Sequence, residues 1–296
     1  MSVDSRAILR AANLRPKKSF GQNFLIAHSV ARAIAAACVP DEEVGRARVL
    51  ELGAGVGALT TLLIPRARHV VAIERDRDLV PILEAQLAEA RASGMDGTSR
   101  DPPEGGQHLV EVREADAAKV DVAELLGAAD ESSPRVLCGN LPYQITGRLL
   151  QLAVQQASSI ERAVFMVQSE VADRLVASPS TKEYGALTIF VRAAFDVTRV
   201  MSVGRGSFHP PPDVTSAVVR MTALRPPRAE ETARFRALVR GAFEARRKTL
   251  RNAWQSVAPK EQLARAALAV GVSLDARGET LDVDAYARMA RELARE

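Results

Sequence analysis

Residues 49–60 have the sequence VLELGAGVGALT, and this segment carries the strongest fold signal in the chain. A short apolar run ends in glycines at positions 53, 55 and 57, and an apolar, helix-compatible segment follows. That order is typical of a strand, a tight turn and a helix. Glycine is needed where a side chain would block the approach of a ligand to the backbone, and the unpaired N–H groups at a helix start suit an anionic group.

A second apolar run, residues 69–73, ends at Glu74. A carboxylate at the end of a second parallel strand is placed to accept hydrogen bonds from both hydroxyls of a ribose. Gly53, Gly55 and Ala58 fit the dinucleotide fingerprint G-x-G-x-x-G/A, with Glu74 as the ribose acid. The same segment also fits the pattern E-x-G-x-G-x-G of S-adenosylmethionine (SAM) methyltransferases, which Glu51 begins. The segment therefore predicts a nucleoside cofactor and leaves NAD and SAM open.

Composition places few further limits on function. The chain has 296 residues with 47% hydrophobic residues, 4% aromatics and a net charge of +4, so a polyanionic partner is expected only if the positive charge is clustered. Cys38 and Cys138 lie in apolar runs and predict buried thiols in a reducing compartment. The four histidines lack metal-ligand spacing, so we expect no metal. There is neither a secretory signal nor a membrane span, and we expect a cytoplasmic protein.

The chain alternates as an α/β fold should, and a doubly wound sheet is expected. Residues 93–107 contain four glycines and two adjacent prolines and predict a surface loop. The expected strands are 48–52, 69–74, 108–113, 134–140, 162–168, 196–203 and 214–222, and the expected helices of this part are 29–38, 57–65, 76–91 and 184–195.

Residues 225–228, Arg-Pro-Pro-Arg, predict a domain boundary. We therefore expect a catalytic domain at 1–224, whose first 28 residues form a lid, and a smaller all-α domain at 225–296. The helices expected in the second domain are 229–243, 245–256, 260–269 and 282–294.

Residues 140–143, Asn-Leu-Pro-Tyr, follow an apolar strand. Pro142 pushes Leu141 away from the α region, so the chain stays extended. The side-chain oxygen of Asn140 and the carbonyl of Leu141 then converge on one point, which suits an exocyclic NH2 group. The ring of Tyr143 is placed to stack on the base that carries that group. This tetrapeptide favours an amine methyltransferase over a hydride-transfer enzyme.

These segments, with several others, closely resemble the KsgA (RsmA) family of ribosomal RNA adenine N6-dimethyltransferases. The resemblance runs from about Lys17 to the last helix, and the motifs follow the family's order. They are KKSFGQNFL at 17–25, LELGAGVGALT at 50–60, Glu74, Asp116, NLPY at 140–143, QSEVADRL at 168–175, FHPPPDVTSA at 208–217 and RRKTLRN at 246–252. One departure is visible, because the loop at 93–107 is longer than the family usually has.

The resemblance implies a Rossmann-like SAM-dependent methyltransferase with a C-terminal helical domain. The implied substrate is a pair of adjacent adenosines near the 3′ end of small-subunit (16S) rRNA within a pre-30S particle, and we expect a monomeric enzyme. Tyr143 and Phe208 would sandwich the target adenine, while Asn140 and Leu141 would bind its amine. The implied cofactor residues are Gln22, Asn23, Leu25, Glu51, Gly53, Gly55, Glu74, Asp116 and Asn140.

Positive charge is concentrated between Arg225 and Trp254, with nine Arg or Lys residues against three acids. Beside an RNA-methylating domain, such a run predicts contact with phosphate. The candidate RNA-binding residues are Lys17, Lys18, Arg246, Arg247, Lys248 and Arg251. The rival functions left open are an NAD-dependent oxidoreductase, a non-catalytic ribosome-assembly factor and a large-subunit rRNA methyltransferase of the antibiotic-resistance type.

Overall fold

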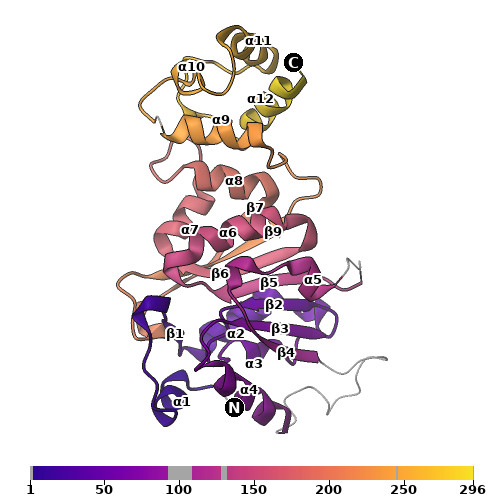
Figure 1. Ribbon diagram of the computed structural model, residues 1–296, viewed down its shortest axis with the longest axis vertical. Helices are drawn as coiled ribbons and strands as arrows, with labels where there is room; N and C mark the ends of the chain where they lie inside the picture. Colours follow the sequence, from indigo (N-terminus) through magenta and orange to yellow (C-terminus); the bar gives the residue numbers. More distant parts are fainter. Residues whose placement is uncertain (1–2, 93–108, 128–131, 245, 296) are drawn as a thin grey trace. The chain divides into compact units, whose positions relative to one another are not determined.

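A computed structural model describes residues 3–92, 109–127, 132–244 and 246–295 (Figure 1). The loop predicted at 93–107 lies outside the described residues. The chain forms two compact units, Met1–Ser169 with Thr198–Thr222 and Glu170–Val197 with Ala223–Glu296. The longer segment of the second unit begins at Ala223, near the boundary expected at 225. The unit also contains an earlier segment, Glu170–Val197, which was not expected in it.

Among the described residues, seven strands form one sheet in the order β4-β3-β2-β5-β6-β9-β7. Neighbours from β4 to β6 are parallel, and β9 runs antiparallel to β6. The order changes direction between β2 and β5, and ligands bind at such a switch point in doubly wound sheets. The predicted α/β class is confirmed. The strands are β2 Arg48–Leu52, β3 His69–Glu74, β4 Leu109–Glu114, β5 Arg135–Asn140, β6 Arg162–Gln168, β7 Phe195–Val203 and β9 Ser216–Ala223.

Helices lie on both sides of this sheet (Figure 1), so its central strands are buried on both faces. Val49 is in register with Val70 and Val136, and this face packs against α2 and α3. The residues that follow them, on the opposite face, are equally inaccessible to solvent. The helices of the first unit are α1 Ser5–Ala11, α2 His28–Cys38, α3 Thr60–Leu63, α4 Val80–Ala92, α5 Val122–Leu126 and α6 Thr146–Gln155.

Helix α3 is much shorter than the helix predicted at 57–65. Gly53, Gly55 and Gly57 all have positive φ, at 75°, 59° and 87°, so the turn continues to the end of the glycine series. A side chain at Gly57 would also come within 2.9 Å of Leu83 Cδ1. The glycines thus leave bare backbone at the carboxyl edge of the sheet. Residues 57–59, which were predicted to begin the helix, belong to the turn instead.

The second unit has its own aromatic core. Trp254 and Tyr286 are fully buried, and their polar atoms are satisfied because Trp254 Nε1–H donates to the Leu238 carbonyl at 2.8 Å and the Tyr286 hydroxyl to the Gly278 carbonyl at 2.9 Å. Every helix within the described residues is too short or too polar to span a bilayer. The helices after the first unit are α7 Ser169–Val176, α8 Ala186–Ala194, α9 Ala233–Glu244, α10 Leu250–Ala253, α11 Lys260–Val270 and α12 Val283–Arg295.

The helix predicted at 245–256 is wrong in its first part, because α10 begins only at Leu250. The backbone N–H groups of Leu250 and Arg251 donate to the carbonyls of Ala276 and Leu274 rather than to carbonyls one turn earlier. These tertiary hydrogen bonds fix a helix start at this point. Residues 246–248 consequently lie in a turn and not in the predicted helix.

Candidate active site

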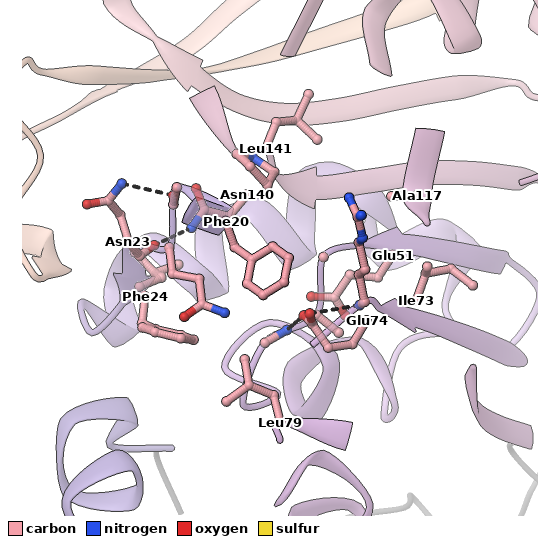
Figure 2. A pocket seen from close by; sticks show the side chains of 18 of the residues that line it. Phe20, Asn23, Phe24, Glu51, Ile73, Glu74, Leu79, Ala117, Asn140 and Leu141 are labelled. Carbon is pink, nitrogen blue, oxygen red and sulfur yellow. Dashed lines mark hydrogen bonds between the residues drawn. The ribbon is translucent and has the colours of Figure 1, made fainter. Parts of the chain in front are cut away.

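The carboxyl ends of β2, β3 and β5 surround one cavity in the first unit (Figure 2). Its position at the switch point of the sheet is the one expected for a ligand site in this fold. Glu51 lies at its floor, and the other lining segments are 19–25, 53–56, 73–75, 115–117 and 140–145.

The glycine turn forms one wall of the cavity. The N–H groups of Gly53 and Ala54 donate to the Ile73 carbonyl, which ties the turn to the end of β3. A side chain at Gly55 would lie 3.3 Å from the ring of Phe24, so this position has both a conformational and a steric need for glycine. The turn therefore keeps bare backbone facing the cavity.

Glu74 organises the turn through its carboxylate. Oε2 accepts from Gly55 N–H at 2.8 Å, and Oε1 accepts from the N–H groups of Arg75 and Asp76 at 2.8 Å each. Burial raises the pKa of Glu74, and these backbone donors oppose that rise only in part. A carboxylate has about four acceptor sites, so beside the three N–H donors one site remains for a ligand hydroxyl.

Glu51 is more deeply buried, with 2% of its surface exposed. The Thr60 hydroxyl donates to its Oε2 at 2.7 Å. Burial raises the pKa of Glu51 to about 8, against the lowering effect of the Thr60 hydrogen bond, and the neighbouring Glu74 charge adds to the rise. The cavity floor therefore holds a carboxyl group that is largely protonated at neutral pH.

Asn140 lies at the end of β5, opposite these acids (Figure 2). One N–H of its Nδ2 group donates to the carbonyl of Asn23 at 2.8 Å, which sets the orientation of the amide and leaves Oδ1 as an acceptor for a ligand. The next residue, Leu141, is held by a hydrogen bond from its N–H to the Met166 carbonyl at 3.1 Å. The strand end thus presents a fixed set of acceptors to the cavity.

The N-terminal segment is fastened to the end of β3. Lys17 Nζ lies 2.6 Å from both Asp76 Oδ1 and Asp78 Oδ2, and Gln22 Nε2 donates to Asp76 Oδ2 at 2.8 Å. Burial acts to raise the pKa of Asp76, but the hydrogen bonds from Lys17 and Gln22 outweigh it and the net shift is downward. Figure 2 shows the Phe20 ring of this segment extending into the cavity.

Of the two aromatic residues predicted for the site, Tyr143 lines the cavity and Phe208 does not, within the described residues. Tyr143 lines the cavity, and its hydroxyl is 2.8 Å from Ser216 Oγ. Phe208 is only 2% exposed and does not line the cavity within the described residues. Its backbone pairs with Leu25, and it belongs to the core cluster that includes Ile34, so in this structure it is part of the core.

Comparison with known proteins identifies the family. The model of the family described as ribosomal RNA adenine dimethylase matches residues 13–295. The chain belongs to the ribosomal RNA adenine dimethylase family.

Individual relatives agree with this assignment. "Ribosomal RNA small subunit methyltransferase A" of Anaeromyxobacter sp. (strain K) is 40% identical over 298 residues, which cover 97% of each chain. The protein with the same description from Geobacter metallireducens is 39% identical, covering 96% of this chain and 98% of the relative. Among solved structures, a dimethyladenosine transferase from Plasmodium falciparum has a TM-score of 0.74 at 25% identity and covers 92% of this chain and 98% of its own. The 23S rRNA methyltransferase ErmE has a TM-score of 0.63 at 26% identity, covering 92% and 100%.

This dimethylase is therefore an enzyme of the rRNA adenine N6,N6-dimethyltransferase class, in a family of SAM-dependent methyltransferases. The dinucleotide interpretation of the glycine turn and the oxidoreductase alternative are thereby excluded. The structure brings together around one cavity most of the residues predicted for cofactor and target: Gln22, Asn23, Leu25, Glu51, Gly53, Gly55, Glu74, Asp116, Asn140, Leu141 and Tyr143.

Several residues of this dimethylase site were missed in the sequence. Phe20 and Phe24 line the cavity, and both belong to the KKSFGQNFL motif, so the pair of aromatics on either side of the two amides was the available signal. Arg75 also lines it, with its guanidinium carbon 5.7 Å from the centre of the Phe20 ring. Asp76 binds Lys17 of the N-terminal segment and also bonds to Glu74 through its backbone N–H. In the sequence, the one sign of this role was its position two residues after Glu74.

The predicted RNA-binding residues differ in the partners that they contact. Lys17 pairs with Asp76 and Asp78, as described above. In the second unit, Arg246 lies 3.8 Å from Glu279, and Arg251 lies 3.1 Å from Asp275. Arg247 and Lys248 are exposed and have no ion pair with any residue that the structure describes.

Proposed function

We propose that this dimethylase transfers methyl groups from SAM to the N6 amines of two adjacent adenosines near the 3′ end of small-subunit (16S) rRNA. The product would be N6,N6-dimethyladenosine at both positions. The observation that carries the proposal is the placement of Asn140, Leu141 and Tyr143 on the same cavity as the glycine turn and Glu74. That arrangement puts acceptors for an exocyclic amine, and a ring for its base, next to a nucleoside site.

The N6 amine of adenine is a weak nucleophile because its lone pair is delocalised into the ring. Hydrogen bonds from its protons to Asn140 Oδ1 and the Leu141 carbonyl would draw that lone pair out of conjugation. The Asn23 carbonyl, which accepts from Asn140 Nδ2, keeps the side-chain oxygen available for this task. SAM supplies a sulfonium methyl group that is already activated, so positioning accounts for most of the acceleration.

The residues present fit SAM. Glu74 would accept from the ribose, and Asp116 from the adenine amine. The bare backbone at Gly53 and Gly55 leaves room for the methionine portion. The remaining contacts are assigned to the N-terminal segment and the cavity floor: Gln22, Asn23, Leu25, Glu51 and Asn140.

Glu74→Ala is expected to weaken SAM binding by about 1.5–3 kcal/mol, the value of a hydrogen bond to a charged group. Isothermal titration calorimetry measures this directly. The matched control is Glu114→Ala, which removes an exposed carboxylate from the end of the adjacent strand β4. Affinity of the Glu74 variant within twofold of the wild-type value would show that this carboxylate does not hold the cofactor.

The choice of the small subunit rests on relatives. The proteins described as small subunit methyltransferases are 39–40% identical to this chain, whereas ErmE, described as a 23S rRNA methyltransferase, is 26% identical. The large-subunit alternative is therefore the less favoured one. A non-catalytic assembly role is disfavoured because the residues assigned to cofactor and target are intact.

The proposal is tested by incubating the enzyme with tritiated SAM and immature small subunits, with large subunits in a parallel reaction. We expect labelled N6,N6-dimethyladenosine in digests of the small-subunit RNA alone. Label in the large-subunit RNA, or in a different nucleoside, would contradict the proposal. Calorimetric titration with SAM and with NAD, in which only SAM should bind, tests the cofactor separately.

We assign docking of the RNA backbone to the exposed part of the basic run in the second unit. Arg246 also lies 3.5 Å from the carbonyls of Lys182 and Tyr184, so its contacts are those of a structural residue. Arg251 is paired with Asp275. Arg247 and Lys248 are left as the stronger candidates for phosphate contact.

Changing Arg247 and Lys248 together to Ala is expected to lower the salt slope of RNA binding by about 1.4–1.8 units, at about 0.7–0.9 for each phosphate contact. Filter binding over a range of salt concentrations measures the slope, and SAM affinity should not change. The matched variant is Arg246→Ala, which should lower the melting temperature because it removes a residue with partners inside the unit. An unchanged slope in the double variant would move the docking site elsewhere.

A further inference from the structure

We propose that Ser216 is a positioning residue that fixes the ring of Tyr143 in the target-base site. This inference rests on the proposed function, in which Tyr143 is the surface on which the adenine stacks. Ser216 lies far from Tyr143 in the sequence, on strand β9, and it does not line the cavity within the described residues. It would act only through the tyrosine.

The geometry of the pair supports this role. The Tyr143 hydroxyl and Ser216 Oγ are 2.8 Å apart, the usual distance for a hydrogen bond between two hydroxyls. Ser216 has no exposed surface, so water does not compete for its hydroxyl group. Tyr143 is half-buried, with its ring on the cavity and its hydroxyl directed to the sheet. Burial raises the pKa of Tyr143, against the lowering effect of the Ser216 hydrogen bond.

The anchor itself is rigid. Ser216 is the first residue of β9 and is in register with Gln168 at the end of β6. The residue before it is held as well, because the Thr215 carbonyl accepts from Ser169 N–H at 3.0 Å. Since β9 is an interior strand of the sheet, the backbone that carries the Ser216 hydroxyl is held in place.

Tyr143 needs such an anchor because its backbone does not fix its ring. It begins the 3₁₀ turn Tyr143–Ile145, in which Ile145 N–H and the Thr146 hydroxyl both bond to the Pro142 carbonyl. These bonds position the Cα atom, but they leave the first side-chain torsion a choice among staggered values. A hydrogen bond at the hydroxyl, at the far end of the ring, selects one of these values and fixes the axis along which the ring lies beside a base.

The test is a double-mutant cycle on the rate of the first methyl transfer, measured in single turnover at saturating SAM and RNA. S216A and Y143F each remove the hydrogen bond and keep the ring. We expect both to slow the reaction by the same factor, about two- to tenfold, as for loss of one neutral hydrogen bond. The double variant should be no slower than either single variant, and the SAM dissociation constant should be unchanged throughout.

A matched control separates positioning from stability. Ser133 is 2% exposed and donates a 2.8 Å hydrogen bond to the Arg46 carbonyl, so S133A removes a similarly buried hydroxyl away from the cavity. S133A should react at the wild-type rate. The inference is overturned if S216A is as fast as wild type, if the two losses multiply in the double variant, or if S133A is slowed as much as S216A.

Y143A distinguishes failure of this inference from failure of the proposed function. Y143A also removes the stacking ring, so it should react about 5- to 150-fold more slowly than wild type and more slowly than Y143F. A slow Y143A together with a wild-type S216A overturns only the positioning role. A Y143A variant with full activity overturns the role of Tyr143 as the stacking surface, and with it both proposals for this residue.

Discussion

Alanine in place of Asn140 is expected to lower the rate of methyl transfer by about 10²–10³-fold, the range found when one preorganised hydrogen-bonding group is removed from an active site. The side chain has two tasks in the proposed mechanism. Its oxygen accepts from the target amine, and its NH2 group is bound to the Asn23 carbonyl at 2.8 Å, which sets the direction of that oxygen. Alanine removes the acceptor and the link to the N-terminal segment together.

The measurement is the single-turnover rate on immature small subunits, with the RNA dissociation constant determined in parallel. RNA affinity should stay near the wild-type value, because the docking residues lie in the other unit of the chain. Asn252→Ala, which truncates an exposed asparagine of that unit, serves as the control. Dimethylation by Asn140→Ala at the wild-type rate would place the target amine at another site.

Glutamine in place of Glu51 is expected to change the pH dependence of stability by several kcal/mol. The pKa of Glu51 is about 8 in the folded protein, and an unfolded glutamate has a pKa of about 4.3. Between these values the folded chain keeps a proton that the unfolded chain releases. The free energy of unfolding of the wild type therefore falls as the pH rises through this window, by up to about 1.4 kcal/mol for each unit of pKa difference.

Glutamine has no proton to release, and its oxygen can still accept from the Thr60 hydroxyl, which lies 2.7 Å from the carboxylate in the wild type. The variant should therefore gain stability over the wild type progressively from pH 5 to pH 8. Urea denaturation at pH 5, 6.5 and 8 measures the difference, and contributions from Glu74 largely cancel between the two proteins. The control is Glu114→Gln, at an exposed position. Parallel pH profiles for Glu51→Gln and wild type would mean that Glu51 is ionised in the fold.

The sheet was the most predictable part of the chain. Its central strands β2, β3, β5 and β6 are almost entirely buried, so they appear in the sequence as mainly apolar runs that end at glycine or at a polar residue. The ends of β2, β3 and β5 were therefore located correctly, and with them Gly53, Glu74 and Asn140.

Features that depend on distant parts of the chain were not predictable. The start of α10 is set by hydrogen bonds to the carbonyls of Ala276 and Leu274, which no local pattern reveals. The burial of Phe208 follows from its pairing with Leu25, far away in the sequence. The ion pairs of Lys17 were unpredictable for the same reason, because its partners Asp76 and Asp78 are distant in the sequence and come close only in the folded chain.

The most direct test of the account is to map the modified bases in the small-subunit RNA by primer extension after reaction with SAM. Two methyl groups on N6 block the base-pairing edge of adenine, so reverse transcription should stop at two adjacent adenosines near the 3′ end. The stops should depend on SAM, and with the Asn140→Ala variant they should be absent at the reaction time at which the wild type has just finished. Stops at any other position, or SAM-dependent stops that persist with Asn140→Ala, would contradict the assignment of the site and of its substrate.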